Sequence, residues 1–255
     1  MPDASLIAAV EKAALWAWPP ERTAGVGGWL LKHGGAGSRR LNSAATLTFD
    51  GSCDVDRAIA EVRRWYDERH VPPCFHLTDA AVPADLDRRL DVLGWRYLTP
   101  TDVLLRPVDR AEPTPSTPHE IVLETRPTPL VMGALAPVDW TAGQRAARVA
   151  IFARIRRPSA FAVTLDHGLP IAGGLCVVDG DHAGIFSMHT QPAYRGRGIA
   201  STVLARLARW AADMGAGMLY LQVEQANAAA AKLYRRSGFE RVYGYHYRQW
   251  GEGKA

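Results

Sequence analysis

The stretch SMHTQPAYRGRGIA, from Ser187 to Ala200, decides how the rest of the chain is interpreted. It predicts a strand, a short turn and then glycines that open a helix. Glycines at the start of a helix let backbone N–H groups close around an anion, because no Cβ blocks the approach. The N-terminus of the helix adds its own partial positive charge. The stretch therefore predicts a turn that holds a diphosphate.

Two possible sources of that diphosphate are disfavoured by the residues around the turn. A P-loop is excluded because no Gly-Lys-Ser/Thr follows the glycines. A dinucleotide-binding turn fits the sequence better than a P-loop does. Gly196 to Ser201 is GRGIAS, one letter short of GxGxxG, and Glu224 ends the next predicted strand. However, Pro192 to Arg195 separate the strand from the glycines, and the motif lies late in the chain, with too few βα units around it. The dinucleotide remains the weaker alternative.

The third candidate, acetyl-CoA, rests on a resemblance. The residues PAYRGRGIA, Pro192 to Ala200, resemble the [Q/R]-x-x-G-x-[G/A] motif of the GNAT superfamily, the Gcn5-related N-acetyltransferases. A later stretch resembles the family's second motif and is Leu221-x-Val223-x-x-x-Asn227-x-x-Ala230-x-x-Leu233-Tyr234-x-x-x-Gly238-Phe239. Two motifs in the right order and at the right separation are more specific than either alone. The resemblance covers roughly the second half of the chain and implies acetyl-CoA as cosubstrate.

The resemblance also implies which residues bind the cofactor. The CoA diphosphate is expected on the backbone amides of Arg195, Gly196, Arg197, Gly198, Ile199, Ala200 and Ser201. The pantetheine arm is expected along the preceding strand, against backbone groups of Met188, His189 and Thr190. One N–H of that strand would polarise the thioester carbonyl and stabilise the oxyanion.

Three further residues carry expected roles, each with a plainer alternative. Asn227 resembles the family's amide contact to CoA, although asparagine is also an ordinary helix N-cap. Tyr234 resembles the tyrosine that protonates the departing thiolate, a role that suits a phenol of pKa about 10, or it packs in the core. Glu224 is the best-placed carboxylate for a general base, or it is a surface residue. No cysteine lies in either motif, which argues against a covalent thiol intermediate.

The first half of the chain repeats the predicted order of the second. Both contain strand, helix, strand, helix, Gly-aromatic and strand, with Gly94-Trp95 matching Gly238-Phe239. Leu90 stands where Tyr234 stands, so the first copy is expected to have lost the chemistry. We expect two GNAT-like domains of mixed α/β (α+β) fold, each a central mixed β-sheet flanked by helices. A degenerate domain would span residues 1–106, a proline-rich linker 107–118 and the acetyl-CoA-binding domain 119–255.

Within the first copy, a strand is expected from Arg40 to Thr48. The polar segment Ser38 to Ser43 at its entry would face the acceptor cavity or form a solvated turn. The expected repeat also predicts that the chain binds one CoA, not two.

Composition limits the classes of protein to which the chain could belong. The chain has 255 residues, 47% of them hydrophobic and 22% charged, with a formal charge of +4, which is typical of a soluble protein and too mild for nucleic-acid binding. The three scattered cysteines form no CxxC pattern, so neither a disulfide framework nor a metal site is expected. No leader peptide and no apolar run of about 20 residues is evident. We expect a cytoplasmic monomer or homodimer with no membrane partner.

These patterns together predict an acetyl-CoA-dependent N-acetyltransferase. The acetyl group would pass from CoA to a primary amine of a small molecule or peptide by direct nucleophilic attack. An acyl-CoA-binding sensor or assembly module without turnover is the alternative from another class.

Overall fold

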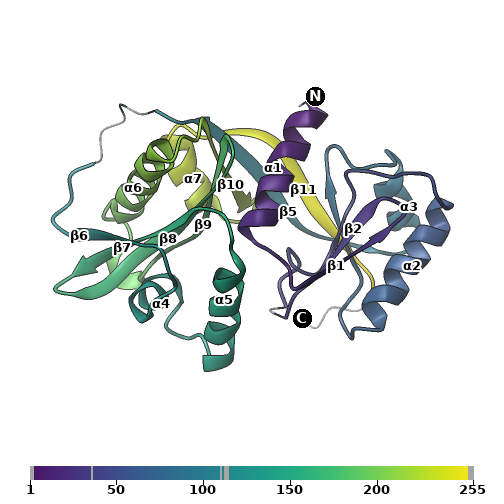
Figure 1. Ribbon diagram of the computed structural model, residues 1–255, viewed down its shortest axis with the longest axis horizontal. Helices are drawn as coiled ribbons and strands as arrows, with labels where there is room; N and C mark the ends of the chain where they lie inside the picture. Colours follow the sequence, from purple (N-terminus) through teal and green to yellow (C-terminus); the bar gives the residue numbers. More distant parts are fainter. Residues whose placement is uncertain (1–2, 36, 110, 112–114, 252–255) are drawn as a thin grey trace.

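The computed structural model describes residues 3–35, 37–109, 111 and 115–251 (Figure 1). These residues form one mixed sheet of eleven strands in the order β1-β2-β3-β4-β11-β5-β10-β9-β8-β7-β6. The strands are β1 (Arg22–Val26), β2 (Trp29–His33), β3 (Ala44–Ala45), β4 (Cys74–Thr78), β5 (Arg96–Pro107), β6 (Glu120–Glu124), β7 (Ser159–Asp166), β8 (Leu169–Asp179), β9 (His182–Thr190), β10 (Met218–Glu224) and β11 (Glu240–Gln249). The predicted mixed α/β fold is confirmed, and a single sheet runs through both halves of the chain.

The two halves exchange their last strands at the centre of this sheet. β5, the last strand of the first half, lies antiparallel to β10 from Pro107 opposite Met218 to Thr101 opposite Glu224. β11, the last strand of the second half, pairs instead with β4 of the first half. β5 and β11 also pair with each other. Each half is therefore completed by a strand of the other.

Helices cover both faces of the sheet (Figure 1). They are α1 (Ala4–Ala17), α2 (Val55–Asp67), α3 (Leu86–Val92), α4 (Pro129–Leu135), α5 (Ala142–Arg154), α6 (Ile199–Asp213) and α7 (Ala228–Arg236), with a short 3-10 turn η1 (Pro192–Tyr194). α1 lies across the middle of the sheet, between the two halves. Capping residues determine where three of these helices begin. Asp3, Asp54 and Thr141 each accept a backbone N–H from the first turn of α1, α2 and α5, respectively.

The alternation of side chains along β10 shows which helices share a face. Leu219 and Leu221 pack into a core with α6 and α7, whereas Tyr220 packs into a core with α1, α4 and α5. A third core lies under α2 and α3 and contains Trp29 and Phe75. The face of the sheet under α1 is therefore the face opposite α6 and α7.

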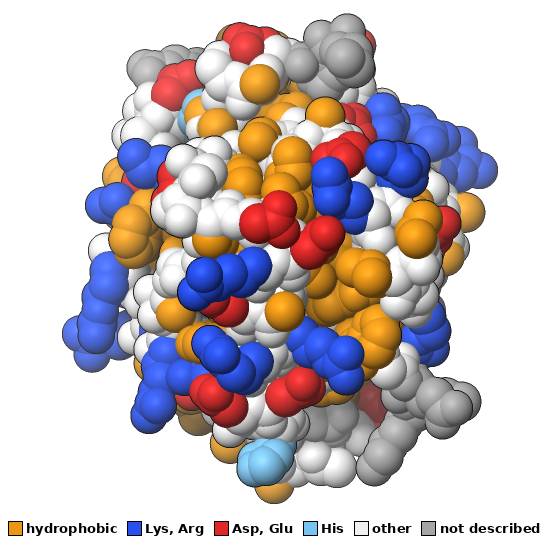
Figure 2. Space-filling view, turned by 90° about the vertical axis from the view of Figure 1, so that its right-hand side faces the viewer, with side chains coloured by type: hydrophobic (Ala, Val, Ile, Leu, Met, Phe, Trp, Pro, Cys, Tyr) orange, Lys and Arg blue, Asp and Glu red, His pale blue; other side chains and the backbone are white. Residues whose placement is uncertain are grey.

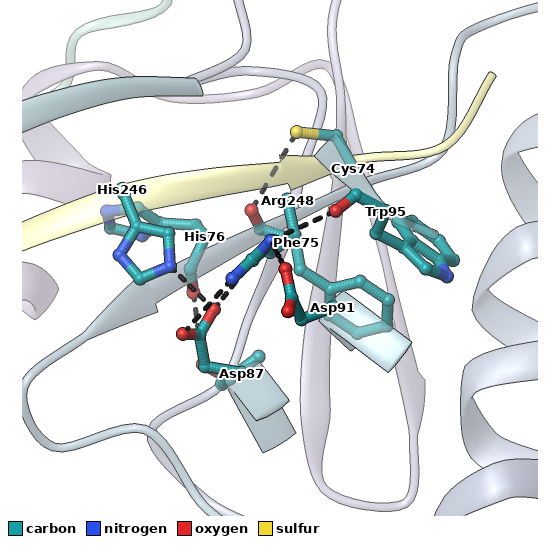
Figure 3. Close-up of polar contacts among 9 residues, drawn as sticks. Cys74, Phe75, His76, Asp87, Asp91, Trp95, His246 and Arg248 are labelled. Atoms are coloured by element: carbon teal, nitrogen blue, oxygen red, sulfur yellow. Dashed lines mark hydrogen bonds and ion pairs between the residues drawn. The ribbon is translucent and has the colours of Figure 1, made fainter. Parts of the chain in front are cut away.

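Charged side chains tie the exchanged strand β11 to the first half (Figure 3). Arg248 of β11 is 7% exposed and donates to the carboxylates of Asp87 and Asp91, at 2.7 and 2.6 Å, and to the carbonyl of Trp95 at 3.0 Å. His246 lies 2.8 Å from the same Asp87 carboxylate. Two aspartates of α3 therefore hold a largely buried guanidinium that belongs to the other half of the chain.

The outer face of α2 and α3 carries an apolar groove between charged side chains (Figure 2). Its apolar lining includes Val92, Leu93, Trp95 and Trp250, and Val92 is 78% exposed. Among the described helices, none combines the length and apolar character needed to cross a bilayer.

The structure corrects one expected strand and adds another. The strand expected from Arg40 to Thr48 is wrong, because only Ala44–Ala45 pair as β3. Asn42 explains the difference, since its side chain accepts from the Gly34 N–H and donates to the Ser38 carbonyl, which favours a turn. The strand β1 was not predicted from the sequence. Part of the expected linker, residues 110 and 112–114, lies outside the described residues.

Candidate active site

The candidate site begins where two parallel strands part. β9 and β10 pair in parallel from His182 opposite Met218 to Ile185 opposite Leu221. Beyond these residues β9 continues to Thr190 along β8, while β10 continues to Glu224 along β5. The two strands thus diverge toward their C-terminal ends and leave a V-shaped opening in the sheet.

A bulge marks the β9 side of this opening. The register of β8 and β9 shifts between Leu175 opposite Phe186 and Gly173 opposite His189, so that Ser187 and Met188 lie across from Gly174 alone. Ser187 has a φ of 51°, in the left-handed region. A Cβ on Gly174 would collide with the Met188 side chain, which explains the glycine. A bulge leaves the backbone of the extra residue out of the ladder, available to another partner.

The glycine turn follows at the end of β9. Gly196 and Gly198 have φ values of 76° and 78°, which side chains with a Cβ rarely adopt. Among the described residues, nothing lies within 4 Å of a Cβ built on either glycine, so the turn is open to solvent. α6 starts at Ile199 without a side-chain cap. Its first N–H groups and the positive end of its dipole point at this open turn, which suits an anion.

The arginine side chains of the turn hold its backbone. Arg195 donates to the Thr190 carbonyl at 3.1 Å, and Arg197 donates to the Ala193 carbonyl at 3.0 Å. The Arg197 guanidinium also lies 5.3 Å from the centre of the Tyr194 ring. Both arginines therefore shape the turn and add positive charge beside it.

α7 lies on the other side of the opening, after β10. Asn227 accepts the Ala230 N–H at 3.1 Å and so caps this helix. Tyr234 is 8% exposed, and its ring packs edge-on against Phe239. Burial raises the pKa of Tyr234 to about 12. No described residue forms a hydrogen bond with the Tyr234 hydroxyl.

Glu224 lies on the opposite face of the sheet from Tyr234. Along β10, Gln222 and Glu224 share the side of Tyr220, toward α1, whereas Tyr234 packs in the core under α6 and α7. Gln222 and Glu224 line a cavity of about 320 Å³ that reaches Arg40 and Tyr245. The opening between β9 and β10 thus has a phenol near one face and a carboxylate at the other.

His189 contributes a neutral imidazole near the end of β9. Burial, with the nearby Arg195, lowers the pKa of His189 below its usual 6.5. The imidazole is therefore uncharged at neutral pH. Around it, the described residues contain no cluster of three or more histidine, cysteine or carboxylate side chains that could hold a metal ion.

Several side chains near the opening belong to no recognisable sequence motif. Arg148 of α5 donates to the Ser187 hydroxyl at 3.1 Å. Glu11, Lys32 and His76 line a second cavity under α1, which the first half of the chain largely builds. Of this region, the sequence had indicated only the segment from Ser38 to Ser43. The remaining residues are brought together by long-range packing that no local pattern records.

The parting strands, the bulge and the glycine turn define an acyltransferase of the GNAT superfamily. The chain belongs to the family described as "Probable histone acetyltransferase Rv0428c C-terminal", whose model matches residues 4–248.

Individual relatives and solved structures are similar to this chain over nearly its whole length. An uncharacterized N-acetyltransferase of Bacillus subtilis, YobR, is 26% identical over 249 residues, covering 94% of this chain and 96% of its own length. The structure of a GCN5-related N-acetyltransferase from Kribbella flavida superposes with a TM-score of 0.70 at 17% identity, over 99% of this chain and 97% of that one. A tandem GNAT protein from the clavulanic acid biosynthesis pathway superposes with a TM-score of 0.66 at 11% identity, over 95% and 88% of the two chains. The predicted superfamily and its tandem form are confirmed.

Proposed function

We propose that the protein transfers an acetyl group from acetyl-CoA to a primary amine by direct attack. The observation that carries this proposal is the end of the β9–β10 pairing at Ile185 and Leu221. It leaves an opening with the glycine turn and the uncapped start of α6 at the end of β9, and a polar cavity on the α1 face. A thioester held there is open to an amine from the other face of the sheet.

In this proposal the cofactor lies along β9 and the turn after it. The diphosphate binds the backbone N–H groups of Arg195 to Ser201, and the pantetheine arm follows Met188, His189 and Thr190. Freed backbone at the bulge supplies an N–H for the thioester carbonyl oxygen. Asn227 has its side-chain oxygen engaged as a helix cap, so only its amide nitrogen is free to contact CoA.

The chemical step uses one group from each face. The amine nitrogen attacks the thioester carbon, and the carbonyl oxygen carries the negative charge of the tetrahedral intermediate. Glu224, directly or through water, accepts a proton from the attacking nitrogen. The C–S bond then breaks, Tyr234 protonates the departing thiolate, and the amide and free CoA result. The raised pKa of Tyr234 keeps the phenol protonated at neutral pH, as a general acid requires.

Thermal unfolding and thiol release together test this proposal. Acetyl-CoA is expected to raise Tm by several degrees and NAD to leave it unchanged. A panel of primary amines is then added with acetyl-CoA, and free thiol is followed over time. Stabilisation by NAD alone would favour the dinucleotide alternative. Stabilisation by acetyl-CoA with no thiol release for any amine would favour a sensor.

A further inference from the structure

A second cavity lies beneath α1, next to the proposed site for the amine. Its volume is about 190 Å³, larger than the roughly 150 Å³ of an apolar cavity known to hold benzene. Much of its lining is apolar or aromatic, including Leu15, Trp18, Leu30, Leu47 and Tyr247. The cavity is therefore suited to a compact apolar group such as the side chain of leucine or phenylalanine.

The same cavity contains cationic side chains that lack a carboxylate partner. Lys32 is 7% exposed, and Arg40 is partly buried beside it. In the described part of the chain neither forms an ion pair. Glu11 is close enough for its charge to favour both cations, but its carboxylate accepts from the Tyr243 hydroxyl at 2.8 Å and lies 3.8 Å from Nδ1 of His76. With Lys12, which also lines the cavity, three formal positive charges and one negative charge leave an excess of +2, which an anionic ligand would reduce.

His76 adds an unsatisfied polar atom to this cavity. It is 6% exposed, and its Nε2 has no hydrogen-bond partner among the described residues. Burial and the neighbouring cations Lys32 and Arg40 hold the pKa of His76 well below 6.5, so the ring is neutral. This ring nitrogen is therefore a buried polar atom that can form a hydrogen bond with a ligand in the cavity.

Arg40 joins this cavity to the proposed site of acetyl transfer. It donates to the Tyr245 hydroxyl at 3.4 Å, which in turn donates to Gln222 at 3.2 Å, just past the end of the β9–β10 pairing. Its guanidinium also lies 5.5 Å from the ring centre of Phe186 in β9. Arg40 and Gln222 line both this cavity and the one that contains Glu224.

We propose that the acetyl acceptor is a compact apolar α-amino acid. Its carboxylate binds Arg40 in the field of Lys32, its side chain fills the cavity under α1, and its amine points past Gln222 toward Glu224 and the thioester. This inference rests on the proposed function and adds the class of acceptor. It assigns acceptor selection to the first half of the chain, which carries no cofactor motif. Polyamines and other polycations are disfavoured by the same positive charges.

The first test compares matched acceptors on the unmodified protein. Phenylalanine and leucine are each compared with their amide and their decarboxylated amine, with thiol release from acetyl-CoA as readout. We expect kcat/KM to be at least tenfold higher for the acids than for either analogue. The amide has a less basic amine, more of which is unprotonated at neutral pH, so amine protonation cannot produce a preference for the acid over its amide. Equal or faster transfer to the uncharged analogues would overturn the inference and leave the proposed function standing.

The second test measures binding without turnover. The probe is 3-phenylpropionate, which keeps the ring and the carboxylate but has no amine. It is expected to raise Tm of the CoA-bound wild type and of Arg22→Met, an exposed cation on β1, and not of Arg40→Met. Arg40→Lys, which keeps the charge, is expected to retain part of the shift. A shift that persists in Arg40→Met, or that is absent in the wild type, would overturn the inference. If no amine releases thiol but this shift is seen, the proposed function fails and the acceptor role with it, while the cavity remains a binding site for an apolar carboxylate.

Discussion

Arg148 donates a hydrogen bond of 3.1 Å to the hydroxyl of Ser187, the residue with positive φ at the bulge of β9. The guanidinium lies within 5.0 Å of the ring centres of Trp18 and Trp140, so aromatic faces surround it. Burial, together with the charge of Arg40, lowers the pKa of Arg148 to about 10. A cation from α5 thus fixes the strand segment that we propose to hold the thioester.

Removing either partner of this bond is expected to lower kcat by about tenfold, because the bulge loses its fixed position. The three variants Arg148→Met, Ser187→Ala and their combination form a double-mutant cycle. We expect the combined variant to be little worse than each single one, with the KM for acetyl-CoA changed less than kcat. Fully additive losses would show that the two side chains act independently.

Tyr234→Phe is expected to lower kcat by about 10²-fold or more, since general-acid catalysis contributes roughly 10²–10⁴ in rate. Acetyl-CoA binding, measured by titration calorimetry, should be unchanged because the ring and its contact with Phe239 remain. Leu233→Ala, a neighbouring change on α7, serves as a control for disturbance of the helix. An unaltered kcat in Tyr234→Phe would remove the tyrosine from the mechanism.

Gly198→Ala is expected to weaken acetyl-CoA binding at least tenfold. The new Cβ has room, but the left-handed φ of 78° strains any residue other than glycine by about 1–2 kcal/mol and favours a changed turn. Gly180→Ala is the matched control, because Gly180 has a φ of 59° and equal space in the β8–β9 hairpin. We expect both variants to lose similar amounts of stability. Only Gly198→Ala is expected to lose acetyl-CoA binding. Equal cofactor binding in the two would argue against this turn as the diphosphate site.

These positions also show what the sequence could and could not predict. The glycine turn, the strand before it and the cap at Asn227 follow from local spacing, and the structure has each of them. The exchange of β5 and β11 was not predictable, because both strands have ordinary alternation and their partners are chosen by distant packing. Lys32 and His76 were missed for the same reason, since each lies in a strand of the first half that has no motif.

The lowered pKa of Lys32 allows acceptor selection to be tested by changing the pH. Burial lowers the pKa of Lys32 from 10.5 to about 8, so the ammonium loses its proton as the pH rises through that value. The Tm shift given by 3-phenylpropionate, which has no amine and stays an anion over this range, is therefore expected to fall between about pH 7 and pH 9. Lys32→Met should show a smaller Tm shift with no such step. A step of the same size in that variant would assign it to another group.

The same buried ammonium is expected to cost stability. Below about pH 8 both the folded and the unfolded state hold the Lys32 proton, and the folded state carries the full cost of the buried charge. Between about pH 8 and 10.5 the folded state has lost the proton while the unfolded state still binds it, so this cost falls as the pH rises. Lys32→Met is expected to be more stable than the wild type at pH 7, on the order of 2 kcal/mol in urea unfolding. The gain should be absent at pH 11. Lower stability at both pH values would mean that the lysine contributes mainly through packing.

Exchange of the last strands predicts that both halves unfold together. Arg248→Met removes the guanidinium that joins β11 to Asp87 and Asp91, and we expect a loss of about 3 kcal/mol. Calorimetry should show one transition in the wild type and in this variant. Arg57→Met, which breaks an exposed pair with Glu61, should change stability by less than about 1 kcal/mol. Two separate transitions in the wild type would contradict the mutual completion of the halves.

The central claim is tested most directly by following both products of one reaction with acetyl-CoA and a primary amine. Free CoA thiol and N-acetylated amine are measured in the same samples over time. We expect the two products to appear in equal amounts and at the same rate, and only when the amine is present. Thiol release that does not depend on the amine, or acetyl-CoA binding with neither product, would contradict it.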